Sequence, residues 1–254
     1  VWLTDLNAEV TSGQVERPVQ DLEAAERASA ELVILRIDTP GAMLEPTRVL
    51  IQAILDSPVP ILGHVAPAGA RASSAGTYIL AATHVAAMAP ATNVGSAKPV
   101  FIGFGEIDED SKLKATNDAS AQMRALAQLR NRNAEWLEQS VVAAKNITAE
   151  EALGLGVIDL IAVNQNDLLK QLQGRQIQMG EAQVILETEG LAVKESTPFE
   201  SLSWATIWLL FGIALIALEL ALTSFISLFF GLGALITAIC LTLGLPPTGW
   251  PVWT

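Results

Sequence analysis

Short apolar runs alternate along the first 163 residues with segments in which apolar residues recur at helical spacing. Residues 32–37 are apolar apart from Arg36, which is typical of a buried strand, and residues 46–56 then repeat apolar positions every three or four residues. This alternation favours a layered α/β fold. It predicts strands over 1–6, 32–37, 59–66, 84–88 and 157–163, and helices over 14–30, 46–56, 74–82, 116–130 and 136–144.

Three further segments have their own signatures. Residues 97–113 combine glycine and acidic residues without helical periodicity, which predicts a loop. Thr148 and Glu151 have the spacing of a capping box, which predicts the start of a short helix. Residues 164–200 change character and predict a β appendage, with a short helix and three strands, that leads into a linker.

The C-terminal part is strongly apolar. Residues 204–223 and 225–245 each come close to the ~20 residues that cross the hydrocarbon core of a bilayer. We therefore expect a transmembrane helical hairpin. Gly231 and Gly233 are expected to allow close helix packing. Glu219 is expected to snorkel or to be protonated near a helix end, in preference to a functional role.

The charge distribution excludes some classes of function. The net charge is −12, and no Lys or Arg follows Lys194. An acidic soluble part argues against nucleic-acid binding, which needs basic patches for the phosphates. Because no basic residue flanks the apolar runs, the positive-inside rule gives no orientation for them in the membrane. Cys240 is the only cysteine, so it forms no internal disulfide, and it is expected to pack as a small hydrophobe.

Residues 67–78 place Ser74 among residues too small to cover it, between a predicted strand and a predicted helix. A hydroxyl there lies at the positive end of the helix dipole, beside free backbone N–H groups. This setting suits the formation of an oxyanion. Ser74 is therefore our candidate nucleophile.

Lys114 follows forty residues later, at a predicted helix start, and is our candidate general base. A lysine accepts a proton only as a neutral amine, which an apolar pocket favours by desolvation. Val94, Val100 and Phe101 are expected to form the walls of such a pocket. A serine and a lysine without a suitably placed histidine suggest a catalytic dyad.

Longer motifs carry a family resemblance. They are residues 73–95 around Ser74, Asp38-Thr-Pro-Gly41, Arg132-Asn133-Ala-Glu-Trp136 and Glu150 to Asp159. Together they resemble the NfeD membrane-bound serine proteases, also called stomatin operon partner proteins, of the ClpP/crotonase superfamily. The resemblance covers residues 1–163 and implies a ClpP/crotonase-like layered fold followed by the membrane hairpin.

The resemblance also assigns site residues. It implies an oxyanion hole formed by the backbone N–H groups of Ala75 and Ala42. In the family, the turn that carries the second of these groups usually reads Gly-Gly, whereas this chain has Gly41-Ala42. An alanine at that position disfavours a positive φ. Ala42 therefore raises a second interpretation, a weakened or inactive protease. The family's Ser-Ala-Gly and Lys-x-Thr-Asn patterns select Ser74 and Lys114.

Rival residues remain. Ser73 is the alternative nucleophile, and Lys98 and Lys112 are alternative bases. His64 and His84 could belong to a Ser/His/Asp triad, but their settings at strand ends favour structural roles. We expect no cofactor and no metal, because no cluster of His, Cys, Asp and Glu has metal-ligand spacing and no glycine-rich phosphate loop follows a strand.

The predicted domains are a ClpP-like serine protease domain over 1–163, a β appendage and linker over 164–200, and a membrane region with two transmembrane helices over 201–254. The start at Val1 indicates a removed leader or a fragment, and the last nine residues resemble a loop before another span. We therefore expect a truncated, multi-pass protein of the cell membrane. The resemblance implies an extracytoplasmic protease domain and self-association, at least as a dimer.

Three functions follow. The first is a serine endopeptidase that cleaves hydrophobic segments of membrane proteins, including a stomatin (SPFH-type) partner, next to the lipid bilayer. The second is a catalytically weak or inactive scaffold that organises stomatin-like assemblies. The third, a crotonase-type acyl-CoA enzyme, is the least favoured, because no acidic catalytic residue can be placed and membrane spans are unusual for it.

Overall fold

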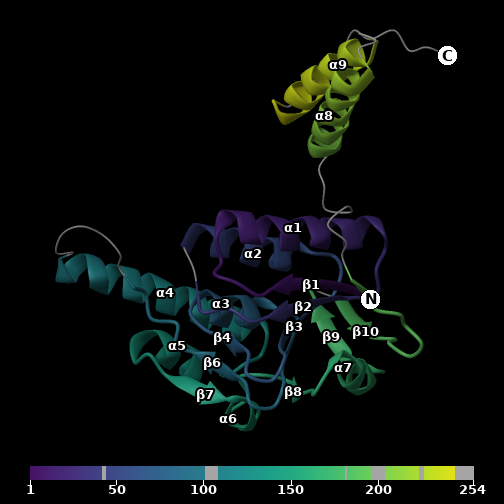
Figure 1. The fold of residues 1–254 in the computed structure, drawn as a ribbon. Helices are drawn as coiled ribbons and strands as arrows, with labels where there is room; N and C mark the ends of the chain where they lie inside the picture. Colours follow the sequence, from purple (N-terminus) through teal and green to yellow (C-terminus); the bar gives the residue numbers. More distant parts are fainter. Residues whose placement is uncertain (42–43, 101–107, 181, 196–203, 223–225, 244–254) are drawn as a thin grey trace. The chain divides into compact units, whose positions relative to one another are not determined.

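A computed structural model describes residues 1–41, 44–100, 108–180, 182–195, 204–222 and 226–243. The chain divides into two compact units, Val1–Ser196 and Thr197–Thr254. The first unit is an α/β domain, as the alternation of strand and helix patterns predicted (Figure 1).

The central sheet has six strands in the order β11-β1-β2-β3-β5-β8, and all of its pairings are parallel. Buried strands of a parallel sheet are apolar on both faces, which explains their continuous apolar runs. The strands are β1 (Trp2–Leu6), β2 (Val33–Ile37), β3 (Ile61–Val65), β5 (Val85–Met88), β8 (Leu160–Ile161) and β11 (Lys194–Glu195).

Each face of this sheet has its own core, because neighbouring residues of a strand point to opposite sides. On one face Val33 and Leu35 pack with the helices α1 (Ser12–Arg27), α2 (Leu44–Asp56) and α3 (Ala75–Ala82). On the other face Ile34 packs with the leucines of α7 (Gln165–Leu172). Figure 1 shows α1 and α2 on one side of the sheet and α7 on the other.

Smaller elements complete the first unit. A three-stranded sheet contains β4 (Arg71–Ala72), β6 (Asn93–Gly95) and β7 (Asn146–Thr148). Next to it are α4 (Glu109–Leu129), α5 (Ala134–Val142) and α6 (Ala149–Gly154). The capping box at the start of α6 is confirmed: the Glu151 N–H donates to Thr148 Oγ1 at 3.3 Å, and the Thr148 N–H donates to Glu151 Oε2 at 2.9 Å.

The predicted loop over 97–113 is wrong at its end, since α4 already begins at Glu109. Asp108 caps this helix by accepting the Ser111 N–H at 2.9 Å. Glu109 and Asp110 then lie in its first turn, where negative charge is favourable. Acidic residues that indicated a loop therefore act as a helix start signal.

Residues 164–195 belong to the first unit. Strands β9 (Gln176–Met179) and β10 (Ala182–Ile185) form an antiparallel pair and confirm two of the three predicted strands, whereas residues 191–193 form no strand. However, β11 pairs with β1, and α7 contributes Leu168 and Leu172 to the core. The segment predicted as an appendage is therefore packed into the α/β domain.

The second unit contains α8 (Trp204–Leu222) and α9 (Ile226–Thr242). A Cβ atom on Gly231 would lie 3.1 Å from the Gly212 carbonyl oxygen, so both glycines allow the two backbones to approach closely. Among the described residues, no helix is both long and apolar enough to span a bilayer. The predicted transmembrane hairpin therefore remains unconfirmed.

Candidate active site

Ser74 lies at the junction of β4 and α3, in an uncommon backbone conformation. Its φ is 49° and its ψ is −113°, a region that residues other than glycine rarely adopt. The Ser74 N–H donates to the Ser96 carbonyl at 2.7 Å, and the Ser74 carbonyl accepts the Thr77 N–H at 3.0 Å. Such conformations persist where the surroundings enforce them, and they gather at functional sites.

The Ser74 side chain is available for chemistry. It is half-buried, and its hydroxyl makes no hydrogen bond to any described residue, not even as a helix cap. Ser73, the alternative nucleophile, is also half-buried, and its N–H donates to the Thr39 carbonyl at 3.1 Å. Of these two serines, Ser74 is the one that combines the helix N-terminus with a positive φ.

Gly41 lies directly against Ser74. A Cβ atom on Gly41 would lie 2.7 Å from Ser74 Cβ and 3.2 Å from Ser74 Oγ, and Gly41 has a φ of 131°. Both the space and the backbone conformation therefore require glycine. The resemblance implied that this turn lies near the candidate nucleophile, through the N–H of Ala42, whereas no pattern in the sequence indicated the contact made by Gly41.

Of the two predicted oxyanion-hole groups, the structure describes one. Ala75 is the first residue of α3, and its N–H has no acceptor among the described residues. Ala42 lies outside the described residues. The Gly41 N–H donates to Thr39 Oγ1 at 3.2 Å.

Lys114 lies near the start of α4, whose first turns extend beyond the neighbouring elements (Figure 1). Its ammonium group is 3.6 Å from the Asp110 carboxylate, and its side chain is 79% exposed. No hydrogen bond or ion pair joins it to Ser74 in the described part of the chain. The structure therefore does not bring the predicted dyad together, and the pairing remains a prediction.

The residues expected to form an apolar pocket around Lys114 are placed differently in the structure. Val94 is buried in the main core, whereas Val100 is 81% exposed. Phe101 lies outside the described residues. Of the alternative bases, Lys112 pairs with Glu109 at 2.7 Å, and Lys98 is exposed.

The two histidines have structural contacts. His84 Nδ1 accepts the Ile61 N–H at 3.1 Å, and burial lowers the pKa of His84 to about 3. His64 is almost fully buried, and its Nε2 lies 3.0 Å from the Ala162 carbonyl oxygen. Neither ring is hydrogen-bonded to Ser74. Among the described residues, no group of three or more His, Cys, Asp and Glu is placed to hold a metal.

The far end of α3 is held by arginines. Arg132 donates through Nη1 to the carbonyls of Leu80 and Ala81, at 3.1 and 2.8 Å, and Arg130 donates to the Ala82 carbonyl at 2.8 Å. These are the last carbonyls of α3, where the helix runs out of its own N–H donors, and the carbonyl of Leu80 also accepts from the C-cap residue Thr83. Cations here also interact favourably with the helix dipole.

Asp159 balances this buried charge. It accepts from Arg132 at 3.0 Å, from Arg175 at 3.2 Å and from the Ala86 N–H at 2.7 Å. Burial lowers the pKa of Arg132, and Asp159 opposes that shift. The sequence had suggested no pairing of these residues, because they are far apart along the chain.

Comparison with known proteins places this geometry in context. The family described as NfeD1b, N-terminal domain, matches residues 1–182. A membrane-bound protease of Pyrococcus horikoshii, PH1510, is 35% identical over 176 residues, which are 68% of this chain and 40% of that protein. The chain thus spans about 40% of the length of this relative.

Two solved structures of 1510-N, described as a membrane-bound stomatin-specific protease, are similar to this chain. A variant with a serine replaced by alanine has a TM-score of 0.73 at 32% identity, covering 78% of this chain and 97% of that one. A variant with a lysine replaced by alanine, in complex with a substrate peptide, has a TM-score of 0.72 at 31% identity, covering 78% and 91%.

Proposed function

Because the chain belongs to the NfeD1b N-terminal-domain family, we propose that it is a serine endopeptidase in which Ser74 is the nucleophile and Lys114 the general base. The observation that carries this proposal is the geometry of Ser74. Its hydroxyl is unpaired among the described residues and lies beside the Ala75 N–H, at a positive φ and against Gly41. The ClpP/crotonase-like assignment of the α/β domain, with residues 1–163 as its protease part, belongs to the same proposal.

The proposed reaction begins with attack of Ser74 Oγ on the carbonyl carbon of a peptide. The hydroxyl proton passes to the neutral amine of Lys114, which then delivers a proton to the leaving amine. The N–H groups of Ala75 and Ala42 stabilise the negative oxygen of the tetrahedral intermediate. Water then releases the acyl group from Ser74. The reaction requires Lys114 to exchange its ion pair with Asp110 for a contact with Ser74.

We propose hydrophobic segments of membrane proteins, including a stomatin-type partner, as the substrates. Two similar structures are described as a stomatin-specific protease, and one of them holds a substrate peptide. We extend the proposal to attachment of residues 204–242 to the lipid bilayer, to an extracytoplasmic protease domain and to self-association at least as a dimer. The apolar sequence of α8 and α9 supports the membrane attachment.

A catalytically weak scaffold for stomatin-like assemblies is the second candidate, and one observation favours it. Lys114 is exposed and paired with Asp110 on its own helix, and no described contact joins it to Ser74. A base that never reaches Ser74 would leave a folded protein without appreciable peptidase activity. Alanine at position 42, where the family usually has glycine, points the same way.

Labelling with a fluorophosphonate, together with cleavage of an apolar peptide, separates the two candidates. We expect Ser74 to be labelled, and we expect Ser74→Ala and Lys114→Ala to lose peptide cleavage while keeping their unfolding midpoints. Lys112→Ala is the matched control on the same helix, since it removes an exposed ion pair with Glu109. A protein that binds a stomatin-type partner but is never labelled at Ser74 would establish the scaffold.

A further inference from the structure

The backbone N–H of Ser74 is held by residues from another part of the chain. It donates to the carbonyl of Ser96 at 2.7 Å, at the short end of the range for N–H···O bonds. Ser96 directly follows Gly95, the last residue of β6. The position of residues 95–97, the Ser96 segment, therefore restricts where the Ser74 backbone can lie.

Three neighbouring groups hold the Ser96 segment in turn. Asn146 Nδ2 donates to the Gly95 carbonyl at 2.5 Å, and the Ala97 N–H donates to the Ser140 carbonyl at 2.9 Å. The Tyr78 hydroxyl lies 3.4 Å from the Ala97 carbonyl oxygen, which is long for a hydroxyl donor. Of the two side chains that contact the segment, Asn146 therefore makes the stronger bond.

The strands β6 and β7 approach each other closely where this bond forms. They pair in antiparallel orientation, with Gly95 directly opposite Asn146. A Cβ atom on Gly95 would clash with the Lys145 carbonyl oxygen, and Gly95 has a φ of 96°. Glycine at this position therefore allows β7 to bring the Asn146 side chain onto the Gly95 carbonyl.

Asn93 orients the side-chain amide of Asn146. Asn93 Nδ2 donates to Asn146 Oδ1 at 3.0 Å, so the Asn146 nitrogen, which carries the hydrogens, points to another partner. That partner is the Gly95 carbonyl, which can only accept. The two bonds agree on one orientation of the amide. They form a chain from Asn93 through Asn146 to the residue before Ser96.

We propose that Asn146 is a positioning residue for Ser74: by holding the Gly95 carbonyl, it keeps the Ser96 carbonyl where it accepts the Ser74 N–H. The inference rests on the proposed function, in which Ser74 is the nucleophile. A nucleophile reacts when it lies about 3–3.5 Å from the attacked atom, so small shifts of its backbone matter. The positive φ of Ser74 also persists only while its surroundings enforce it.

Amide hydrogen exchange, followed by NMR on the whole chain, tests this positioning without any need for catalysis. Asn146→Ala removes the donor to Gly95, and because Asn146 is exposed, the change leaves no buried cavity. We expect the Ser74 N–H to exchange about threefold to tenfold faster, the worth of one ordinary hydrogen bond. Asn93→Ala removes only the orienting bond and should give a smaller increase; it decides the matter if Asn146→Ala does not fold.

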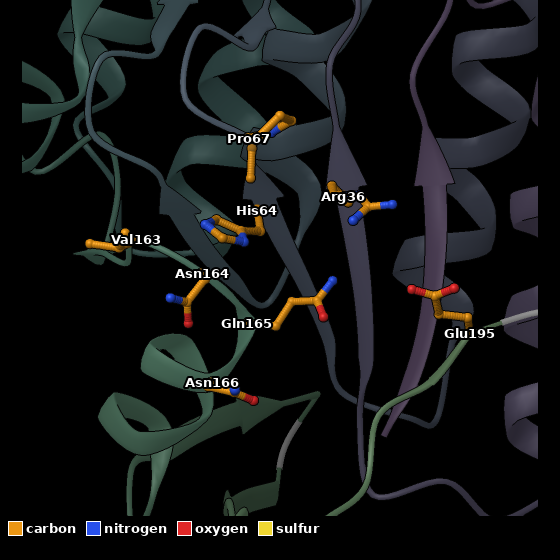
Figure 2. Close-up of a pocket in the computed structure, with 9 residues that line it drawn as sticks. Arg36, His64, Pro67, Val163, Asn164, Gln165, Asn166 and Glu195 are labelled. Carbon is orange, nitrogen blue, oxygen red and sulfur yellow. The ribbon is translucent and has the colours of Figure 1, made fainter.

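Gln171→Ala is the matched control. The Gln171 side chain donates to the Ile161 carbonyl at 2.9 Å, which is the same kind of bond between a carboxamide and a strand carbonyl. Gln171 lies on α7, whose first residues line a cavity of about 270 Å³ on the face of the central sheet opposite to α3 (Figure 2). This variant should leave exchange of the Ser74 N–H unchanged. Equal exchange at Ser74 in control and test variants would overturn the proposal.

Kinetics then show whether the positioning serves the reaction. We expect Asn146→Ala to lower kcat for an apolar peptide by about threefold to tenfold and to leave KM unchanged, because a displaced nucleophile affects the chemical step and not substrate binding. Faster exchange at Ser74 with an unchanged kcat, in a parent that cleaves the peptide, would overturn the positioning role. A parent that is neither labelled by a fluorophosphonate nor active on the peptide would instead refute the proposed function, and the catalytic role of Asn146 with it.

Discussion

The two halves of the proposed dyad are held very differently. Ser74 is fixed by backbone hydrogen bonds to Ser96 and Thr77 and by contact with Gly41. Lys114 is exposed, and its one described partner is Asp110, on the same helix. The fold therefore preorganises the nucleophile but not the base. Catalysis by this dyad would depend on bringing a solvated amine to a rigid serine.

The largest loss of stability is expected from breaking the Arg132–Asp159 pair, which holds the C-terminal end of α3. Asp159→Ala leaves the Arg132 guanidinium buried without its counter-charge, which should cost about 3–5 kcal/mol of unfolding free energy. Urea unfolding measures this loss. Asp118→Ala removes an exposed ion pair with Arg48 and is the control, with an expected cost of about 0.2–1 kcal/mol. Equal costs for both variants would show that the buried cluster does not hold α3.

Gly41→Ala tests whether the contact with Gly41 holds the proposed nucleophile, Ser74, in place. The new methyl group would lie 2.7 Å from Ser74 Cβ, so the serine must shift. Displacement of a reacting group by about 1 Å can cost about 100-fold in rate, and we expect a loss of that order in fluorophosphonate labelling.

Gly69→Ala is the matched control for the glycine substitution. Gly69 also has a positive φ, 88°, but a Cβ atom there meets nothing within 4 Å. Backbone strain alone should thus lower stability in both variants, while labelling of Ser74 should fall only in Gly41→Ala. Equal losses of labelling in the two variants would mean that the contact with Gly41 does not position Ser74 for reaction.

Acid should lower the stability of the protein through His84, which follows the C-terminal end of α3. Burial, and then Arg130 and Arg132, lower the pKa of His84 to about 3 from its ordinary 6.5. The unfolded chain therefore binds a proton first as the pH falls below about 6.5. The stability from neutral His84 is present above that pH and is lost progressively towards pH 3, by about 1.4 kcal/mol per unit.

His84→Gln is the variant that tests this dependence, because a glutamine oxygen can still accept the Ile61 N–H. It should lose about 2 kcal/mol less than the parent between pH 6.5 and pH 5. Unfolding in urea at the two pH values gives the comparison. An unchanged difference between parent and variant would mean that His84 is not held neutral.

The sequence predicted most elements of the α/β domain because their signals are local. The uniform apolar run of β2 and the Thr148 capping box each depend on residues close together in the chain. The start of α4 was missed because Glu109 and Asp110 are as typical of loops as of a helix N-terminus.

The candidate site could be predicted only in part. Ser74 was found from a strand-to-helix junction and a family pattern, both of which lie in one stretch of sequence. Its contact with Gly41 and the bond from Arg132 to Asp159 join segments that are distant in the chain, so no spacing rule indicates them. The exposure of Lys114 depends on where α4 begins, and α4 begins at Glu109 and not at the predicted residue 116.

The smallest effect is expected from a change in the ion pair of Lys114, and it tests the proposed dyad most directly. If Lys114 must leave Asp110 to reach Ser74, then Asp110→Ala removes an exposed pair worth about 0.2–1 kcal/mol, and peptide cleavage should rise by no more than about fivefold. Glu109→Ala, which frees Lys112 instead, should leave the rate unchanged. A fall in rate after Asp110→Ala would mean that Asp110 positions the amine for catalysis. The base would then act from the helix as it stands, and the contrast between a fixed serine and a free lysine would disappear.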